Sequence, residues 1–542
     1  MTAASPATQA APRSRVLPDP RLVEFLVCST ALAGGRVGGR LPLPVAWLAA
    51  VIALHGLVLV RWPARPGLRL ACFALMLALL GVVPAARYIQ ATARGDVRMA
   101  IDGGVLVSDE AVEVLLRGRD PYQASYDQVL ARWRINVEGR PATNPLVHHY
   151  PYWPGSLALL AGVEAPLRLA GLDADPRVLY LLVFCALGLW LGRWSLRERG
   201  HLGVALAVCL NPLLLPYLWQ GANDILLIAG MSVAAVALAG RRIVLAGLAL
   251  GAALSVKLLI APMVVLFVVW IAAEARRGRL DRARAWWAAA ATVAPAAVTA
   301  LPFLLWHPCD FLTDAVAYHL NLVADAYPIA GHGLPAYLLR AGVLHDPFGP
   351  SPPWATVLPT AAVMLAGCWW MWIRPGRRTV LWVSGLVLLG VLLFHRSFMF
   401  YYVDIPATAL FLAAFGEPGP GQASRSCLRA AIRSRQKALC LSAVPASGTR
   451  SWVRATWLLA SPRAVKAITR RVEPSSQFAR IDLPGRAVRT STAAPGSQRS
   501  RTTGSAKASY SRSTPTATVL VALTSNWPPR RCPGALSPRA CS

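Results

Sequence analysis

Long apolar runs, separated by short arginine-rich connections, occupy most of the first 416 residues of the chain. Helices built from runs of this length can cross the hydrocarbon core of a bilayer, which is roughly 30 Å thick. Clear spans are predicted near residues 44–60, 68–86, 176–192, 202–218, 225–240, 285–306, 354–373, 379–394 and 402–416. The pattern therefore predicts an all-α protein, a polytopic transmembrane helical bundle.

Two further apolar runs bring the expected number of spans to about 11–12. Residues 243–273 are too many for one upright helix, and Lys257 near their middle, with Pro262 just after it, predicts a hairpin of two short helices. Residues 22–38 are interrupted by Glu24 and Arg36, so their own pattern leaves the crossing open. The orientation of the other spans favours a crossing there.

Arginine orients these spans, because it gathers in alternate connections and the positive-inside rule places such connections in the cytoplasm. The arginine-rich connections are residues 61–69, 193–199, 241–242, 276–284 and 374–378. The opposite side then receives a large first loop, residues 87–175, and a second loop, residues 307–353. If residues 22–38 cross, residues 1–21 form a cytoplasmic segment before a membrane domain of residues 22–416.

The composition agrees with a membrane protein and gives no sign of a nucleic-acid partner. Hydrophobic residues make up 55% of the chain and charged residues only 15%, which is low for a soluble domain. Of the net charge of +30, residues 417–542 supply +18, from 21 basic and 3 acidic side chains. This basic, low-complexity tail lacks a core pattern, so we expect it to be disordered, and it also resembles a shifted reading frame.

Eight of the 25 acidic residues lie between residues 96 and 138 of the first loop. Within it, SDEAVEVLLRGRDPY (residues 108–122) predicts a short amphipathic helix that Ser108 or Asp109 caps and Gly118 ends, with Glu113 paired to Arg117. The helix would rest on the membrane surface and hold Asp109 where lipid meets water. Asp109 is therefore a candidate catalytic base, although capping alone would also explain it.

Aromatic residues follow this helix and lead into the next apolar segment. Tyr122 follows Asp120 in a turn, and Tyr150, Tyr152 and Trp153 belong to the stiff sequence YPYWP. Such rings can stack on sugars, but they also serve as ordinary anchors at the membrane interface. Residues 156–171 are expected to lie at the interface instead of spanning the bilayer.

Lys257 is the only lysine in the first 416 residues, and it interrupts an apolar run. An ammonium there is costly unless it snorkels to the headgroups or meets an anion such as a lipid phosphate. Gln220 and Asp224 form a hydrogen-bonding turn between two spans, and His395 and Arg396 precede the last span, where the arginine could clamp a phosphate. The acids and histidines of the second loop match no metal-ligand spacing, so no metal site is predicted.

Four segments carry a family resemblance, because they occur in a fixed order between the predicted spans. They are SDEAVEVLLRGRDPY, YPYWP, NPLLLPYLWQGANDIL and GLALGAALSVKLLIAP. With them, residues 20–416 resemble the GT-C superfamily of membrane glycosyltransferases, and most closely the polyprenol-phosphate-mannose-dependent mannosyltransferases of glycosyltransferase family 87. The resemblance implies a many-helix fold with an essential acid in the first external loop.

The resemblance also assigns roles to residues of this sequence. Asp109 matches the family's loop acid, with Glu110 adjacent, and Lys257 matches its membrane lysine. Asp120 and Tyr122 match its Gly-x-Asp/Asn-Pro-Tyr element. Gln220 and Asp224 match the Gly-Gln-x-x-Asp turn only loosely, because here Gln220 precedes Gly221.

The function that the resemblance implies is transfer of a hexosyl group, with mannose expected, from a polyprenyl-phosphate sugar to a lipid or glycan acceptor of the cell envelope. The active site would lie on the extracytoplasmic side of the plasma membrane. Asp109 would act as the base of a single inverting displacement, and Lys257, with Arg396 or His395, would stabilise the departing phosphate. No cofactor is expected, and a divalent metal is left open.

Two alternatives remain from the sequence. A multi-pass transporter, or a flippase for lipid or polysaccharide, also has many helices and charged membrane residues, but it often shows paired halves, and no internal repeat is visible here. A membrane polymerase or ligase of cell-surface polysaccharide would be a close chemical relation.

Overall fold

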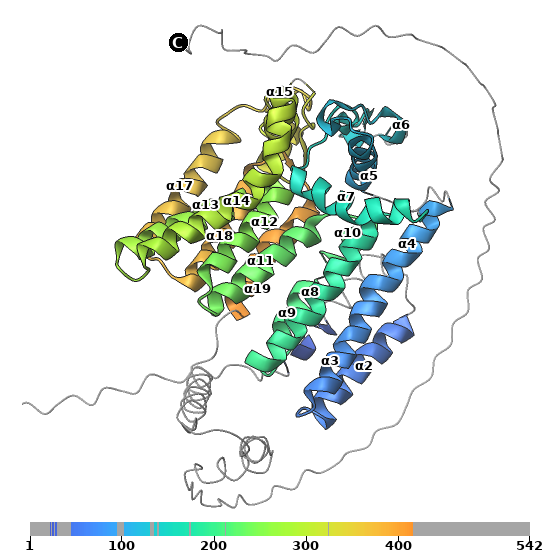
Figure 1. Cartoon of the computed structure of the whole chain (residues 1–542), viewed down its shortest axis with the longest axis vertical. Coiled ribbons are helices and arrows are strands. Elements are labelled where there is room, and N and C mark those ends of the chain that lie inside the picture. The colour runs from blue at the N-terminus through green and yellow to red at the C-terminus, as the bar shows by residue number, and fades with distance from the viewer. Residues whose placement is uncertain are drawn as a thin grey trace, which may run out of the picture. The chain divides into compact units, whose positions relative to one another are not determined.

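The computed structural model describes residues 22, 24–26, 28–29, 45–94, 102–130, 135–137, 140–172, 175–211, 213–323 and 325–415. This part of the chain is almost entirely helical (Figure 1). Its longer helices are α2 (Val45–Arg61), α3 (Pro66–Leu77), α4 (Val83–Ala93), α5 (Gly103–Leu116), α7 (Pro154–Leu169), α8 (Pro176–Glu198), α11 (Asp224–Ala239), α12 (Ile243–Val256), α13 (Ala261–Arg276), α14 (Arg282–Trp306), α17 (Val357–Ile373), α18 (Arg377–Phe394) and α19 (Asp404–Phe415).

Five helical rods are long and apolar enough to cross a membrane. They are Pro66–Ala93, Pro176–Glu198, Leu258–Arg276, Arg282–Trp306 and Arg377–Phe394. The first of them joins α3 and α4 through the π-helical turn η1 (Ala78–Val82). Shorter apolar helices accompany them at Ala46–Arg61, Asp224–Ala239, Ile243–Val256, Val357–Ile373 and Tyr401–Ala414. The chain is therefore a multi-pass membrane protein, and the predicted all-α transmembrane bundle is confirmed.

The predicted hairpin within residues 243–273 is also confirmed. α12 ends at Val256, the 3-10 turn η4 (Leu258–Ile260) follows, and α13 begins at Ala261. Lys257 stands between them with an extended backbone, φ −156° and ψ 131°. Pro262 then occupies the first turn of α13, where its missing N–H costs nothing. This break places the single lysine at the end of two helices.

The single span predicted at residues 202–218 is wrong, because the chain forms two short helices there. These are α9 (Gly203–Cys209) and α10 (Leu215–Gln220). Proline 212 lacks an N–H and disfavours the helical conformation of the preceding residue. Asn211 accordingly leaves the helix, and its Oδ1 accepts a hydrogen bond from the N–H of Leu213 (3.0 Å).

Three sequence predictions concern segments that are wholly or mostly outside the described residues. Residues 22, 24–26 and 28–29 are helical, but the rest of the 22–38 run is not described, so its crossing stays a prediction. The proposed cytoplasmic segment 1–21 and the basic tail 417–542 also lie outside the described residues.

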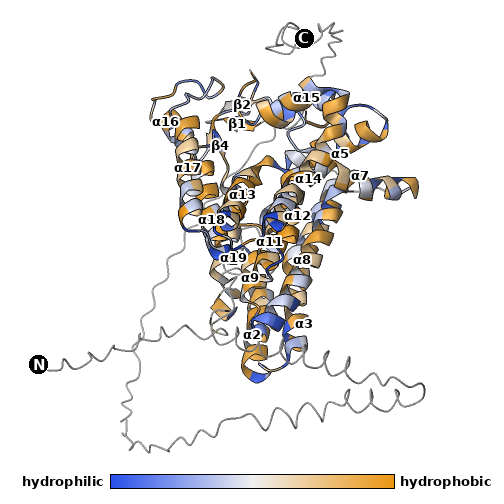
Figure 2. Ribbon diagram, turned by 60° about the vertical axis from the view of Figure 1, so that its left-hand side comes forward, coloured by the Kyte–Doolittle hydropathy of each residue, from blue (hydrophilic) through white to orange (hydrophobic). Residues whose placement is uncertain are grey.

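The polar loops gather at one end of the bundle. α5, α15 (Pro308–Leu312) and the neighbouring loops lie at that end, whereas the α2–α3 and α8–α9 connections lie at the other (Figures 1 and 2). Helix α7 lies across the ends of the long helices in both views, which agrees with the interfacial position expected for residues 156–171. The loop end is the only part of the described chain where strands occur.

Four short strands and several turns tie the loops together. β1 (Ile135–Val137) and β2 (Arg140–Ala142) form an antiparallel pair in which Ile135 faces Ala142. β3 (Ala330–Gly331) and β4 (Ser397–Phe398) pair in parallel, joining the second loop to the segment before α19. The remaining elements are α6 (Asp127–Leu130), α16 (Leu334–Arg340) and the turns η2 (Pro121–Gln123), η3 (Pro145–His148), η5 (Thr313–Ala317) and η6 (Phe400–Val403).

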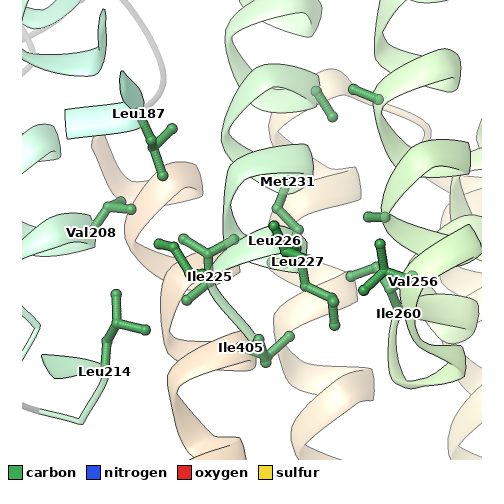
Figure 3. Packing of buried hydrophobic residues seen from close by; sticks show 14 of the residues in the cluster. Leu187, Val208, Leu214, Ile225, Leu226, Leu227, Met231, Val256, Ile260 and Ile405 are labelled. Carbon is green, nitrogen blue, oxygen red and sulfur yellow. The ribbon is translucent and has the colours of Figure 1, made fainter. Parts of the chain in front are cut away.

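Helix α11 lies at the centre of the apolar core. Its Ile225, Leu227 and Met231 are fully buried among side chains from α8, α9, α12 and α19 (Figure 3). Ile225, Val256 and Ile405 belong to this cluster, and each is the direct neighbour in sequence of a charged residue, Asp224, Lys257 or Asp404. The apolar core therefore extends directly up to a group of charged side chains.

Candidate active site

The ammonium of Lys257 is surrounded by acidic and aromatic side chains. Its Nζ donates to Oδ1 of Asp224 (2.7 Å) and to Oδ1 of Asn223 (3.4 Å). Nζ also lies 4.9 Å from the ring centroid of Tyr402 and 6.0 Å from that of Tyr152. The side chain of Lys257 is 12% exposed and that of Asp224 only 2% exposed. An ion pair so shielded from water depends on both partners being present.

The turn that was predicted around Gln220 and Asp224 positions the partners of the lysine. α10 ends at Gln220, Gly221 has a left-handed backbone (φ 97°), and α11 begins at Asp224. A Cβ at Gly221 would overlap Val105, so glycine is required both by conformation and by space. Asn223 and Asp224 are thereby fixed at the N-terminus of α11, facing Lys257.

Asp102 is the acid of the first loop that is near enough for the charge of Lys257 to act on it. Its backbone N–H donates to the carbonyl of Gln220 (2.9 Å), and its Oδ1 accepts from the N–H of Gly104 (2.7 Å). Burial raises the pKa of Asp102, whereas the Gly104 N–H and the charge of Lys257 lower it. As a whole residue, Asp102 is partly exposed.

Asp404 adds a third carboxylate to the group. It begins α19, is 1% exposed, and is close enough for the charges of Asp224 and Lys257 to act on it. We use the name lysine cluster for the residues Asp102, Tyr152, Asn223, Asp224, Lys257, Tyr402 and Asp404. The cluster combines residues from five separate parts of the sequence.

The predicted helix that carries Asp109 exists, but it begins earlier than predicted. α5 starts at Gly103 with Asp102 as its N-cap, so the expectation that Ser108 or Asp109 caps it is wrong. Its end is as predicted, because Gly118 follows Leu116 with a left-handed backbone (φ 73°), and Glu113 pairs with Arg117. Glycines at positions 103 and 104 are poor helix formers, which hid the true start.

Asp109 lies about 10 Å along α5 from its first residues, in a different electrostatic environment. Nη2 of Arg168 donates to Oδ1 of Asp109 (2.9 Å) and to Oε2 of Glu164 (3.0 Å). Burial, opposed by Arg168 and aided by neighbouring acids, raises the pKa of Asp109 to about 6. Its side chain is 46% exposed. Glu110, next to it, is partly buried. The structure thus groups Asp109 with α7 and not with Lys257.

Asp120 and Tyr122 hold the loops together. Asp120 accepts from the N–H of Tyr122 (2.9 Å), and its other oxygen is 2.8 Å from Nδ1 of His307. The hydroxyl of Tyr122 donates to the carbonyl of Tyr152 (2.9 Å). Tyr122 also packs edge-on against Phe311, with ring centroids 5.0 Å apart. These contacts are those of a packed junction between the first and second loops.

The other aromatic candidates divide into buried and partly exposed rings. Tyr150 is fully buried, and Trp153 is partly buried against Phe311 (centroids 6.1 Å apart). Tyr152 alone among them approaches Lys257. Its hydroxyl lies so close to Gly104 that a Cβ there would overlap it. Among these candidates, Tyr152 is therefore the ring best placed to contact a ligand at the lysine cluster.

His149 joins the two loops through charged contacts. Its Nδ1 is 2.6 Å from Oδ1 of Asp314, and its Nε2 is 3.0 Å from Oδ1 of Asp325. Asp314 also accepts from the N–H of Tyr150 (2.8 Å). Burial lowers the pKa of His149, but the hydrogen bonds and charges of the two aspartates outweigh it and raise the pKa to about 9. His149 is consequently protonated at neutral pH.

His395 and Arg396 differ in how they relate to the cluster. Arg396 is 2% exposed, and its Nη2 donates to the carbonyl of Pro347 (3.0 Å) in the second loop. His395 is near His319, which the charge of Lys257 also reaches. Burial lowers the pKa of both histidines, that of His319 to about 4. Both rings are therefore neutral, with one donor and one acceptor nitrogen each. Nε2 of His319 donates to the carbonyl of Pro151, and Nδ1 of His395 accepts from the N–H of Ser397.

Two members of the site were not singled out from the sequence. Asp102 and Asp404 belong to the lysine cluster. Asp102 could have been found as a helix cap, since aspartate is a favoured N-cap residue. Within the described residues no three or more metal-ligating side chains gather closely enough to hold an ion.

Comparisons with known proteins agree with this picture. A search of curated proteins and of solved structures found no match. The family model of glycosyltransferase family 87 matches residues 150–413, which include Asp224, Lys257 and Asp404 but not α5. The match bears out the predicted family and indicates an enzyme, not a transporter. Residues 150–413 therefore match glycosyltransferase family 87, and the match indicates a membrane glycosyltransferase.

Proposed function

We propose that this glycosyltransferase moves a hexosyl group, with mannose as the expected sugar, from a polyprenyl phosphate to a lipid or glycan acceptor. The reaction would take place on the extracytoplasmic side of the plasma membrane, where the positive-inside rule puts the loop end. The observation that carries the proposal is the lysine cluster, because a carboxylate and an ammonium lie together where the membrane spans end. Transfer of a sugar from a lipid-linked phosphate needs both a proton-accepting carboxylate and a positive charge at the depth of the lipid headgroups.

Asp102 is the proposed base. The acceptor oxygen would attack the anomeric carbon, its proton would pass to Asp102, and the bond from that carbon to the phosphate oxygen would break with its electron pair leaving on the phosphate. The raised pKa of Asp102 makes it a better proton acceptor than an exposed aspartate. One displacement of this kind inverts the anomeric configuration, since no second nucleophile is used.

Lys257 is the proposed electrophilic partner. Its ammonium would stabilise the negative charge that develops on the departing phosphate, and Asp224 holds it in place for that task. Neutral His395 can donate a further hydrogen bond to a phosphate oxygen from Nε2, because its Nδ1 accepts from the N–H of Ser397. Tyr152, whose ring lies beside the ammonium, would pack against the sugar.

The roles expected for Asp109, Glu110 and Arg396 change under this proposal. Asp109 lies on the Arg168 side of α5, where it would contact the acceptor and not the reacting bond. Glu110 is its neighbour in sequence and is given no direct part in the reaction. Arg396 is tied to Pro347 and would support the second loop. Gln220 contributes through its carbonyl, which fixes the backbone of Asp102.

The test is transfer of label in membranes that contain the full chain. Polyprenyl phosphate carrying radiolabelled mannose is added, and the products are separated into donor lipid, free sugar and glycosylated acceptor. The proposal expects label in a new acceptor with inverted configuration. Label that stays on the polyprenyl phosphate and only changes leaflet would favour a flippase and contradict the proposal.

A further inference from the structure

A cavity lies where helices α13 and α17 end, at the arginine-rich end of the bundle. Its volume is about 370 Å³, and its lining consists of Ala273, Arg276, Arg277, Trp372 and Ile373. The candidate span Leu258–Arg276 and the shorter apolar helix Val357–Ile373 both end at this cavity. The cavity is therefore at the level where lipid headgroups meet the hydrocarbon core.

Two guanidinium groups are held at the cavity without a carboxylate partner in the described part of the chain. Nη2 of Arg277 donates to the carbonyls of Trp372 and Ile373 (3.0 Å each), which are otherwise unpaired at the C-terminus of α17. Arg276 lies 5.2 Å over the ring of Trp372. By contrast, Arg279 nearby is 3.7 Å from Glu274. Arg276 and Arg277 thus present uncompensated positive charge at a fixed position.

This cavity is separate from the candidate active site. Lys257 and Arg276 stand at opposite ends of the same span, 19 residues apart in sequence, which corresponds to about 30 Å of helix. A donor phosphate at Lys257 cannot reach the cavity. An anion bound there would come from the opposite leaflet.

We propose that the cavity binds the phosphate headgroup of an anionic phospholipid in the leaflet on the arginine-rich side. A guanidinium carries five N–H donors, and Arg277 uses only one of its nitrogens on α17. The remaining donors suit phosphate oxygens, and tryptophan is favoured at this depth of the membrane. Basic pockets between membrane helices are known headgroup sites. The bound lipid would join the ends of α13 and α17.

The experiment uses the full chain in detergent micelles to which phosphatidylglycerol or phosphatidylcholine is added. Native mass spectrometry counts retained lipids, and the melting temperature is followed by tryptophan fluorescence. The main variant is Arg276→Ala, which leaves the Arg277 contacts with α17 intact, and the second is Arg276→Ala/Arg277→Ala. Arg282→Ala/Arg284→Ala is the matched control, because these exposed arginines lie on the same connection but do not line the cavity.

The wild type and the control should retain phosphatidylglycerol and gain thermal stability from it, and phosphatidylcholine should have little effect. The affinity should fall about fivefold for each arginine removed from the cavity. Equal retention of phosphatidylglycerol by wild type and both cavity variants would overturn the proposal. So would equal binding of phosphatidylcholine, or displacement of the lipid by millimolar inorganic phosphate, since the site would then not select a membrane lipid.

Discussion

The N-terminus and the middle of helix α5 each carry an aspartate, and the two differ in their surroundings. Asp102 is fixed by two hydrogen bonds at the N-terminus of the helix and lies beside Lys257, whereas Asp109, in the middle, pairs with Arg168 on an exposed face. Both carboxyl groups have raised pKa values, and burial is the main cause for each. The pKa shift therefore does not distinguish the two acids. The position of the lysine does.

The largest expected effect separates these two acids. Asp102→Asn removes the proposed proton acceptor with little change in shape, and transfer should fall about 10²- to 10⁴-fold. Asp109→Asn should reduce transfer less than about tenfold, because it weakens the contacts of Asp109 with Arg168 and with the acceptor but leaves the proposed proton acceptor in place. Initial rates of label transfer in membranes, scaled to the amount of folded protein, give the comparison. The reverse order of the two variants would return the role of base to Asp109.

Removal of the ammonium should reduce both activity and stability. Lys257→Met leaves the carboxylate of Asp224 buried without its partner, which should cost about 3–5 kcal/mol, and it should lower transfer at least about 10²-fold. Thermal unfolding and transfer rate are measured on the same preparation. The double variant Lys257→Met/Asp224→Leu should recover most of the stability and none of the activity. Recovered activity would show that the lysine acts only through packing.

A methyl group at Gly104 should disturb the site without changing any charge. The new Cβ must displace either the first turn of α5 or the hydroxyl of Tyr152, and a small displacement of Asp102 should slow transfer about 10- to 100-fold. Gly162→Ala on α7 is the matched control, because a Cβ there meets nothing within 4 Å. An unaffected rate in Gly104→Ala would argue against a fixed position for Asp102.

The smallest expected effect is a pH-dependent loss of stability at the junction of the loops. The pKa of His149 is raised to about 9 in the folded protein from an ordinary value near 6.5. Its contribution should therefore be complete below about pH 6.5 and disappear as the pH rises through 9. Melting temperatures of wild type and His149→Gln should differ at pH 6 and converge near pH 10. His148→Gln, at the neighbouring partly buried position, is the control and should not alter this profile.

The sequence predicted the features that depend on patterns along the chain. Apolar runs gave most of the helices, and the single lysine revealed the hairpin at residue 257. The break at Asn211 was missed because one proline in a long apolar run is a weaker signal than the run itself. The start of α5 was missed because two glycines follow its true cap. Such errors arise where a single residue decides the local structure against the pattern of apolar and polar residues around it.

The site was harder to predict than the fold, because its members are distant in sequence. Asp102, Asp224 and Lys257 come together through the backbone bond from Asp102 to Gln220 and through the α12–α13 hairpin. Neither contact leaves a periodic signal. The sequence also could not tell that Tyr122 and Tyr150 would be buried while Tyr152 faces the lysine. Aromatic residues at a membrane interface look alike until their neighbours are known.

The central claim is that one lipid-linked sugar contacts both Asp102 and Lys257. The most direct measurement is a structure of the full chain with a polyprenyl phosphonate sugar, in which the bond that would break is replaced by one that cannot. We expect the phosphonate within hydrogen-bond distance of Nζ of Lys257, and the anomeric carbon facing the space beside Asp102. A sugar bound instead between Asp109 and Arg168, with Lys257 still paired only to Asp224, would contradict the claim.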